Sequence, residues 1–146
     1  MEENLLFISD NSCSNLISLE KPHLDTRGSI QSIINQKNSN VSIITSKKMS
    51  IRSNHYHLTD SHYMYTLSGS YYYFYKKAKS NEMLKRVRVE KNFLIFTPPM
   101  ESHVTIFTED TKLLVISKNF RDQQTYENDT RRVNLIIEDQ INEYIV

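Results

Sequence analysis

The feature that most constrains the fold is a regular recurrence of short segments rich in β-branched and aromatic residues. These segments repeat about every 10–12 residues, with turn-like breaks between them. Such residues favour extended backbone because their side chains pack well on a pleated surface. The predicted strands are residues 29–34, 41–46, 62–68, 70–76, 93–98, 103–108, 112–118 and 133–138. This spacing predicts an all-β sandwich or barrel, and only the tail, with isoleucines at 137, 141 and 145, suits a helix as well as a strand.

The chain of 146 residues is long enough for one domain with its own core. Residues 1–22 are interpreted as an N-terminal arm or added strand, and residues 23–146 as the β domain with a C-terminal tail. Glycine occurs only at Gly28 and Gly69. Each is therefore expected where the backbone needs a tight turn or a positive φ.

Charge and cysteine content exclude several classes of protein. Lys and Arg total 18 and Asp and Glu total 17, so the net charge of +1 lacks the basic bias of a nucleic-acid binder. The single cysteine, Cys13, excludes an internal disulfide framework. No apolar run approaches the roughly 20 residues of a membrane helix, and the one near the N-terminus is too short for a signal peptide. We expect a cytoplasmic protein that binds neither nucleic acid nor a membrane.

Histidines are concentrated in one stretch, NHYHLTDSHYMYTLSG, which holds three of the five in the chain. His55 and His57 are two apart, so on a strand both side chains point to one face. His62 begins the next predicted strand, and His103 opens another strand after a Pro-Pro turn. A barrel could bring these four side chains to one point, whereas His23 fits no pattern and is interpreted as a surface residue.

The histidine spacing resembles the two motifs of the cupin superfamily, over residues 49–107. His55-x-His57, four residues, His62, six residues and Gly69 fit the first motif, with His62 in place of the usual Glu. Pro98-Pro99-Met100, two residues and His103 fit the second. Other motif positions differ: the family's glycines are replaced by Met49, Asn92 and Met100, and its final Asn by Phe107. The resemblance implies a single-domain cupin, a double-stranded β-helix or jelly-roll barrel.

Imidazole ligands limit the chemistry of such a site. Neutral imidazoles suit Zn, Fe, Ni, Cu or Mn, and three or four of them leave a position open for substrate. If His55, His57, His62 and His103 all bind a divalent metal, no carboxylate offsets its charge, and an anionic ligand or a developing enolate is favoured. Two alternatives stay open: His62 is not a ligand, or no metal binds and the His55-x-His57 pair does acid–base work.

A finer resemblance is to the RmlC-like, sugar-nucleotide branch of the cupins. Asp25-x-Arg27-Gly28 and Arg52-x-x-His55-x-His57 resemble segments of dTDP-4-dehydrorhamnose 3,5-epimerases, dTDP-sugar 3,4-ketoisomerases and the cupins of capsular-polysaccharide-synthesis proteins. The usual Arg-Gly-x-His reads Arg-Ser-Asn-His here, and the stretch from 126 to 130 is similar to the tail of the capsular type.

The finer resemblance implies roles for particular residues. Arg52, and with it Arg27, would contact a phosphate or a sugar, because guanidinium suits bidentate phosphate contacts. In a metal-free enzyme, His55 or His57 would be the base that acts next to a ketone. In a metal-bearing relative, His55, His57 and His103 would hold the ion.

Tyrosines crowd around Gly69 and alternate along the segment SYYYFYK. A strand puts Tyr71, Tyr73 and Tyr75 on one face and Tyr72 on the other. Packing in the sheet is the main role expected, with a general acid or a stacking wall as the functional alternative. Tyr73 is the catalytic candidate among them.

The leading hypothesis is a metal-binding cupin enzyme that epimerises or isomerises a nucleotide-linked keto-sugar by removing a proton next to the ketone. Two alternatives are a metal-dependent cupin dioxygenase or lyase acting on a small substrate, and a non-enzymatic cupin that binds a sugar or another small ligand. Because similar cupins commonly pair through sheet edges, we also expect a homodimer, with the N-terminal arm crossing to the partner.

Overall fold

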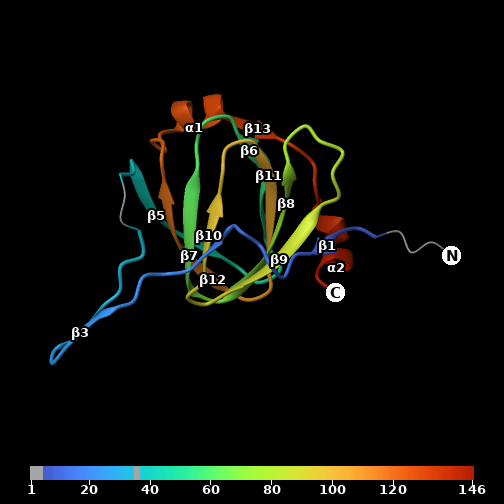
Figure 1. The fold of residues 1–146 in the computed structure, drawn as a ribbon. Coiled ribbons are helices and arrows are strands. Elements are labelled where there is room, and N and C mark those ends of the chain that lie inside the picture. Colours follow the sequence, from blue (N-terminus) through green and yellow to red (C-terminus); the bar gives the residue numbers. More distant parts are fainter. Residues whose placement is uncertain (1–4, 35–36) are drawn as a thin grey trace.

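The computed structural model describes residues 5–34 and 37–146, in which two β-sheets face each other to form a barrel (Figure 1). The first sheet contains, in spatial order, β1 (Ile8–Ser9), β9 (Lys85–Glu90), β8 (Ser70–Lys77), β11 (Glu101–Phe107), β6 (Ile51–His57) and β13 (Thr130–Arg132). The second contains β2 (Leu16–Ile17), β10 (Leu94–Thr97), β7 (His62–Ser68), β12 (Thr111–Ser117) and β5 (Asn40–Ser46). Because β5, β6, β7 and β8 alternate between the sheets, the chain winds as a jelly roll, and the all-β prediction is confirmed.

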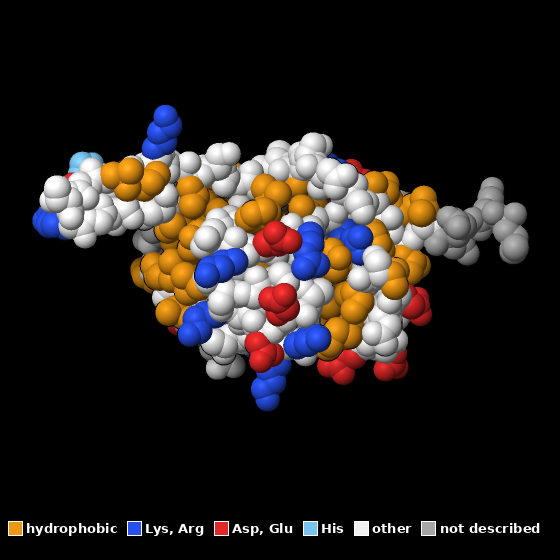
Figure 2. Space-filling model, turned by 90° about the horizontal axis from the view of Figure 1, so that it is seen from below, with side chains coloured by type: hydrophobic (Ala, Val, Ile, Leu, Met, Phe, Trp, Pro, Cys, Tyr) orange, Lys and Arg blue, Asp and Glu red, His pale blue; other side chains and the backbone are white. Residues whose placement is uncertain are grey.

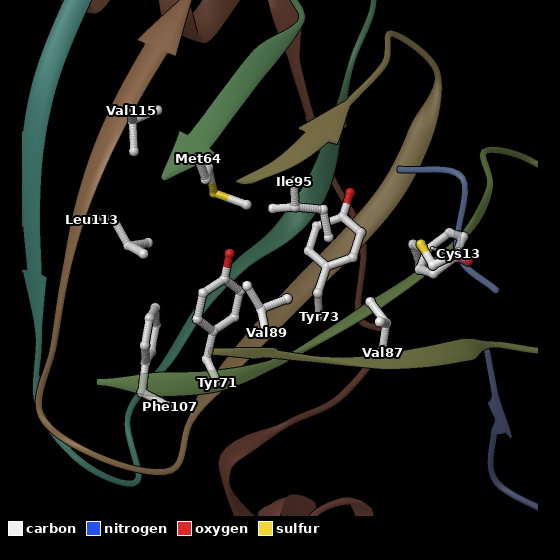
Figure 3. Close-up of a cluster of buried hydrophobic side chains, with 11 residues drawn as sticks. Cys13, Met64, Tyr71, Tyr73, Val87, Val89, Ile95, Phe107, Leu113 and Val115 are labelled. Carbon is white, nitrogen blue, oxygen red and sulfur yellow. Dashed lines mark hydrogen bonds between the residues drawn. The ribbon is translucent and has the colours of Figure 1, made fainter. Parts of the chain in front are cut away.

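The core lies between the two sheets and is largely aromatic and β-branched. Figure 3 shows Tyr71, Tyr73 and Phe107 facing Met64 and Ile95 from the opposite sheet. The alternation expected for β8 holds: Tyr71, Tyr73 and Tyr75 face the barrel interior, and Phe74 packs on the outer side of its sheet. Sequence alone left open which set faces inward, and the sheet pairing decides it.

A second apolar cluster covers the outer face of the first sheet. It joins Phe74 and Val104 to Ile136, Ile141 and Tyr144 of the C-terminal tail. The tail contains the short helices η1 (Glu138–Gln140) and α2 (Ile141–Tyr144). The predicted strand at 133–138 is therefore wrong. Asn54 replaces strand pairing there: its side-chain oxygen accepts from the amides of residues 135 and 136, and its side-chain amide donates to the carbonyl of Ile136.

The N-terminal segment contributes to both sheets and then leaves the barrel. β1 pairs with β9 and β2 pairs with β10, while residues 1–4 of the predicted arm lie outside the described residues. The hairpin of β3 (His23–Asp25) and β4 (Gly28–Ile30) projects away from the barrel (Figure 1). The predicted strand at 29–34 is confirmed only to Ile30, because residues 31–34 pair with no strand.

The polar helix α1 (Gln123–Asp129) escaped the sequence prediction. Its N-cap is Asp122, whose side chain accepts a hydrogen bond from the amide of Thr125 at 3.0 Å. α1 lies across the end of the barrel where β6 ends and β13 begins (Figure 1). In the part of the chain that the structure describes, no helix is long and apolar enough to cross a membrane.

Both glycines have positive φ, as expected, with values of 141° for Gly28 and 90° for Gly69. A methyl group at Gly69 would lie 2.5 Å from the carbonyl oxygen of Asp110, so this position also needs the missing side chain. The residues that stand where the cupin motifs have glycine keep the same backbone form. Their φ values are 65° at Met49, 76° at Ser53, 70° at Asn92 and 60° at Met100.

Candidate metal centre and pocket

Two adjacent strands carry the three histidines that come together. His55 and His57 lie at the end of β6, and His103 lies on β11 directly opposite His55. The pairing of β6 with β11 shifts register beside this point, where Ser53 and Asn54 have positive φ. This irregularity bends β6 just before its histidines. One ligand atom from each of the three rings lies within 4.8 Å of the other two.

The three rings are buried and nearly perpendicular in two of their pairings. The ring centroids of His55 and His57 are 4.6 Å apart, and those of His55 and His103 are 4.8 Å apart. None of the three side chains exceeds 6% exposure, so water competes little for their nitrogens. The arrangement is that of a three-nitrogen donor set open on one side.

His62 lies beside this group and outside it. It begins β7 in the opposite sheet, is half-buried, and has its ring centroid 5.5 Å from that of His57 and 5.6 Å from that of His103. The structure thus brings all four predicted histidines close together, and it separates them into three that share a point and one beside them. The four-ligand set and the three-ligand alternative differ only in the role of His62.

Burial keeps the imidazoles neutral. Burial is the largest cause of the low pKa of His55, about 2, and of His103, about 4. The neighbouring imidazoles contribute to both shifts. The pKa of His57 is lowered by burial although Asp60 and Asp129 oppose the shift, and the pKa of His62 is lowered well below its ordinary value. Neutral imidazole is the form that binds metals.

Outer contacts fix which nitrogen faces the shared point. His103 Nδ1 is 2.9 Å from the carbonyl oxygen of Glu101, which can only accept, so Nδ1 carries the proton and Nε2 is left as the free donor atom. His57 Nδ1 lies 3.3 Å from Thr130 Oγ1 and 3.7 Å from an Asp129 oxygen. His55 Nδ1 is buried without a hydrogen-bond partner. Three neutral imidazoles, one with an orphaned buried nitrogen, fit a divalent metal.

A small pocket of about 130 Å³ opens in front of the histidines. His55, His57 and His62 line it together with Arg121, from the loop before α1, and Tyr126, from α1. The ring of Tyr126 is 6.2 Å from that of His55 and 5.7 Å from that of His57, and the Arg121 guanidinium lies 5.2 Å from its centroid. α1 therefore forms one wall of the pocket.

A larger pocket of about 650 Å³ adjoins the first, and Arg52 lines both. Lys47 and Lys112 add positive charge to its walls, beside the hydroxyl groups of residues such as Ser46 and Thr111. Arg52 is oriented by Ser46 Oγ, which its Nε reaches at 2.7 Å, and by the carbonyl of Thr45 at 2.9 Å. The small pocket is below the roughly 300 Å³ of ordinary ligand sites and the large one is within their range.

Two residues predicted for the site do not line its pockets. The Tyr73 side chain is fully buried in the core, and its hydroxyl is used by Thr97 and Glu101. Arg27 lies on the projecting hairpin, where it pairs with Asp25 at 2.8 Å and lines neither of the pockets beside Arg52. Tyr126 lines the histidine pocket instead. The sequence resemblance marked the stretch from 126 to 130, and the N-cap Asp122 was the local signal for the helix that carries it.

Comparisons with known proteins identify the family of this chain and the fold that it shares. The family model described as "Polysaccharide biosynthesis C-terminal domain" matches residues 23–130. QdtA from Thermoanaerobacterium thermosaccharolyticum, a sugar 3,4-ketoisomerase in complex with TDP, has a TM-score of 0.63 at 21% identity, covering 91% of this chain and 98% of QdtA. WlaRA from Campylobacter jejuni, a TDP-fucose-3,4-ketoisomerase, has a TM-score of 0.61 at 17% identity, covering 76% of this chain and 83% of WlaRA.

A third similar structure is the capsular polysaccharide assembling protein CapF from Staphylococcus aureus. Its TM-score is 0.59 at 21% identity, covering 80% of this chain and 34% of CapF, so this chain spans about a third of the length of CapF. A comparison with curated proteins finds no match. The similar structures confirm the RmlC-like cupin fold that the histidine motifs predicted.

Proposed function

Since the chain belongs to the polysaccharide biosynthesis C-terminal domain family, we propose that it is a metal-binding cupin enzyme that isomerises or epimerises a nucleotide-linked keto-sugar. The observation that carries the proposal is the convergence of His55, His57 and His103 beside a small pocket. His55 and His57 line this pocket, and Arg52 lines both it and a larger pocket with Lys47 and Lys112. The small pocket has room for part of a ligand only, and the larger one can take the remainder. QdtA, a ketoisomerase of similar fold, has been solved with TDP.

Three histidines would hold the metal in this proposal. His55, His57 and His103 are neutral, buried and mutually close, and His62 stays free because it lies outside their group. A divalent ion bound there supplies positive charge that stabilises an enolate oxygen. The donor set is all nitrogen, which suits zinc, iron, nickel or copper and tolerates manganese less well.

The remaining pocket residues would bind the substrate and move its proton. Arg52, Lys47 and Lys112 would hold the phosphates, because cations around a polar groove suit a diphosphate. His62 lines the pocket and lies outside the three-histidine group, so its ring would accept a proton from the carbon next to the ketone. Tyr126, which lines the same pocket, would return a proton, and α1 would exclude water while the enolate exists.

The decisive experiment follows proton exchange. Purified protein is incubated in D₂O with TDP-4-keto-6-deoxyglucose, and deuterium incorporation at the carbon next to the ketone is read by NMR. We expect exchange with the wild type, a loss of about 100-fold or more in the His62→Ala variant, and no change in the His23→Ala control, whose ring is exposed on the hairpin. Absence of both exchange and TDP binding in the wild type would refute the proposal.

Metal analysis of the purified protein separates the remaining candidates. His103→Ala should abolish stoichiometric metal, whereas His62→Ala should retain it. Loss of metal in both variants would restore the four-histidine ligand set. Iron or copper together with oxygen uptake on a small substrate would favour a dioxygenase, and ligand binding without turnover would favour a binding cupin.

A further inference from the structure

We infer that Tyr73 and Glu101 are positioning residues, which hold the His103 imidazole in the orientation that the proposed metal site needs and are themselves held by Asn15 of the N-terminal segment. The inference rests on the proposed role of His103 as a ligand. It gives Tyr73, which does not line the pocket, a function different from catalysis.

The backbone contact of His103 leaves its ring incompletely fixed. The bond from Nδ1 to the Glu101 carbonyl sets the tautomer, but the ring can still tilt about that bond. Tyr73 limits the tilt, because its ring lies almost parallel to the imidazole, at a centroid distance of 6.0 Å and an interplanar angle of 19°. Both side chains are fully buried, so neither can move without displacing core neighbours.

Tyr73 is fixed in turn by its hydroxyl group. That group donates to a carboxylate oxygen of Glu101 at 2.6 Å and is 2.8 Å from Thr97 Oγ1, which can donate to it. Glu101 thus contacts the imidazole through its carbonyl and the tyrosine through its carboxylate. One residue at the start of β11 connects the two rings that stack.

Asn15 completes the connection to the N-terminal segment. The side-chain nitrogen of Asn15 lies 3.0 and 3.2 Å from the two carboxylate oxygens of Glu101. The backbone carbonyl of Asn15 accepts a hydrogen bond from the backbone amide of Phe96 on β10. Among the described residues, no lysine, arginine or histidine forms an ion pair with Glu101. Burial raises the pKa of the Glu101 carboxyl, and the hydrogen bonds from Tyr73 and Asn15 oppose this shift and stabilise the charged form.

The test compares two single-oxygen deletions on one strand. Tyr73→Phe removes the hydroxyl that bonds Glu101, and Tyr71→Phe, the matched control, removes a buried hydroxyl on the same strand that does not bond Glu101. The first readout is the ¹⁵N NMR signature of His103 in metal-free protein. We expect a single Nδ1–H tautomer in the wild type and in Tyr71→Phe, and a mixed or broadened signal in Tyr73→Phe.

The second readout is Co²⁺ affinity by titration. Tyr73→Phe and Glu101→Ala should weaken binding about 10- to 100-fold. Glu101→Gln should lose less, because it keeps an acceptor for the Tyr73 hydroxyl, and Tyr71→Phe should lose nothing. Wild-type His103 spectra and Co²⁺ affinity within about twofold in both Tyr73→Phe and Glu101→Ala, or equal losses in Tyr71→Phe, would overturn the inference.

A milder variant covers the case in which Tyr73→Phe does not fold. Asn15→Ala removes only the outer, half-buried support of Glu101. It should broaden the His103 signal in the metal-free protein, and an unchanged signal would overturn the inference. If the wild-type protein binds no Co²⁺, the proposed metal role fails, and the NMR comparison still decides whether these residues orient the ring.

Discussion

At the scale of single residues, burial decides the charge of the pocket histidines. Each of the four has its pKa lowered chiefly by loss of solvent, and in His55, His62 and His103 the neighbouring imidazoles add to the effect. In the unfolded chain the same rings titrate near pH 6.5. At a pH between the folded and the unfolded pKa of these rings, the unfolded chain therefore binds more protons than the folded protein.

The metal-free protein should therefore lose stability as the pH falls below about 6.5. His103, with its pKa lowered to about 4, contributes up to about 3 kcal/mol of this loss by the time the pH reaches its folded value. Urea unfolding of EDTA-treated protein at pH 7, 6 and 5 measures the slope. The His103→Gln variant should show a shallower slope than the wild type, and equal slopes would contradict the prediction.

Several single residues other than glycine adopt the left-handed backbone conformation, which strains them. Met49, Ser53, Asn92 and Met100 keep positive φ where the cupin motifs have glycine. At a positive φ, a residue with a Cβ is destabilised by about 1–2 kcal/mol through steric strain. Glycine at the same position costs about 0.5–1 kcal/mol in chain entropy. The balance favours glycine at these positions.

Met100→Gly should therefore stabilise the protein by about 0.5–1 kcal/mol. The side chain of Met100 is 37% exposed, so its loss removes little packing. Met83→Gly is the control, since Met83 is similarly exposed and does not have positive φ, and it should destabilise. Chemical denaturation of the two variants decides, and a destabilising Met100→Gly would show that packing outweighs strain.

At the scale of elements, α1 is attached to the barrel through its last residue. The Asp129 carboxylate accepts from the Thr59 amide at 2.8 Å, the Thr59 hydroxyl at 2.7 Å and the Asp60 amide at 2.9 Å, and it lies near His57. These bonds lower the pKa of Asp129 against the opposing effect of burial. They tie the helix that walls the pocket to the loop that follows β6.

Asp129→Ala should cost about 1–3 kcal/mol, because it leaves two backbone amides without their acceptor. Glu127→Gln on the same helix is the control. It removes an exposed ion pair with Arg132, at 3.3 Å, which contributes little to stability. Thermal unfolding followed by circular dichroism compares the two, and a similar small shift in both would argue against the anchoring role.

At the scale of the whole molecule, exposed apolar side chains gather on the projecting hairpin and on the edge strand of the second sheet. Exposed fractions reach 71% for Leu24 and 65% for Ile30 on the hairpin, and 58% for Val41 and 63% for Ile43 on β5. Figure 2 shows hydrophobic side chains beside the base of the hairpin, while charges of both signs are spread over the face seen there. An isolated two-stranded hairpin is marginal in water.

We therefore expect the protein to form a homodimer in which the hairpin and the edge strand β5 are covered. Light scattering after size exclusion should give twice the chain mass of 17.3 kDa. Ile43→Lys should yield the monomer by placing a charge in the contact, whereas Lys112→Glu, on the neighbouring strand β12, should leave the dimer intact. A monomeric wild type would refute the expectation.

The sequence by itself determined the class of fold and the faces of its strands. The two-residue period put His55 beside His57 and Tyr73 beside Tyr71 wherever the strands would lie. The glycine positions were equally local, because a positive φ depends on the residue's own sterics. The strand predicted at 133–138 failed because the Asn54 side chain replaces strand pairing with residues 135 and 136. The helical alternative for the tail is what η1 and α2 adopt, and α1 was not predicted.

Only the tertiary structure decided which residues meet. His103 joins His55 because β11 pairs with β6 in one register, and Tyr126 reaches the pocket because α1 crosses the end of the barrel. Tyr73 turned inward and bonded Glu101, which no alternation rule assigns. Register and crossing depend on pairings between segments far apart in the chain, and local propensity does not encode them.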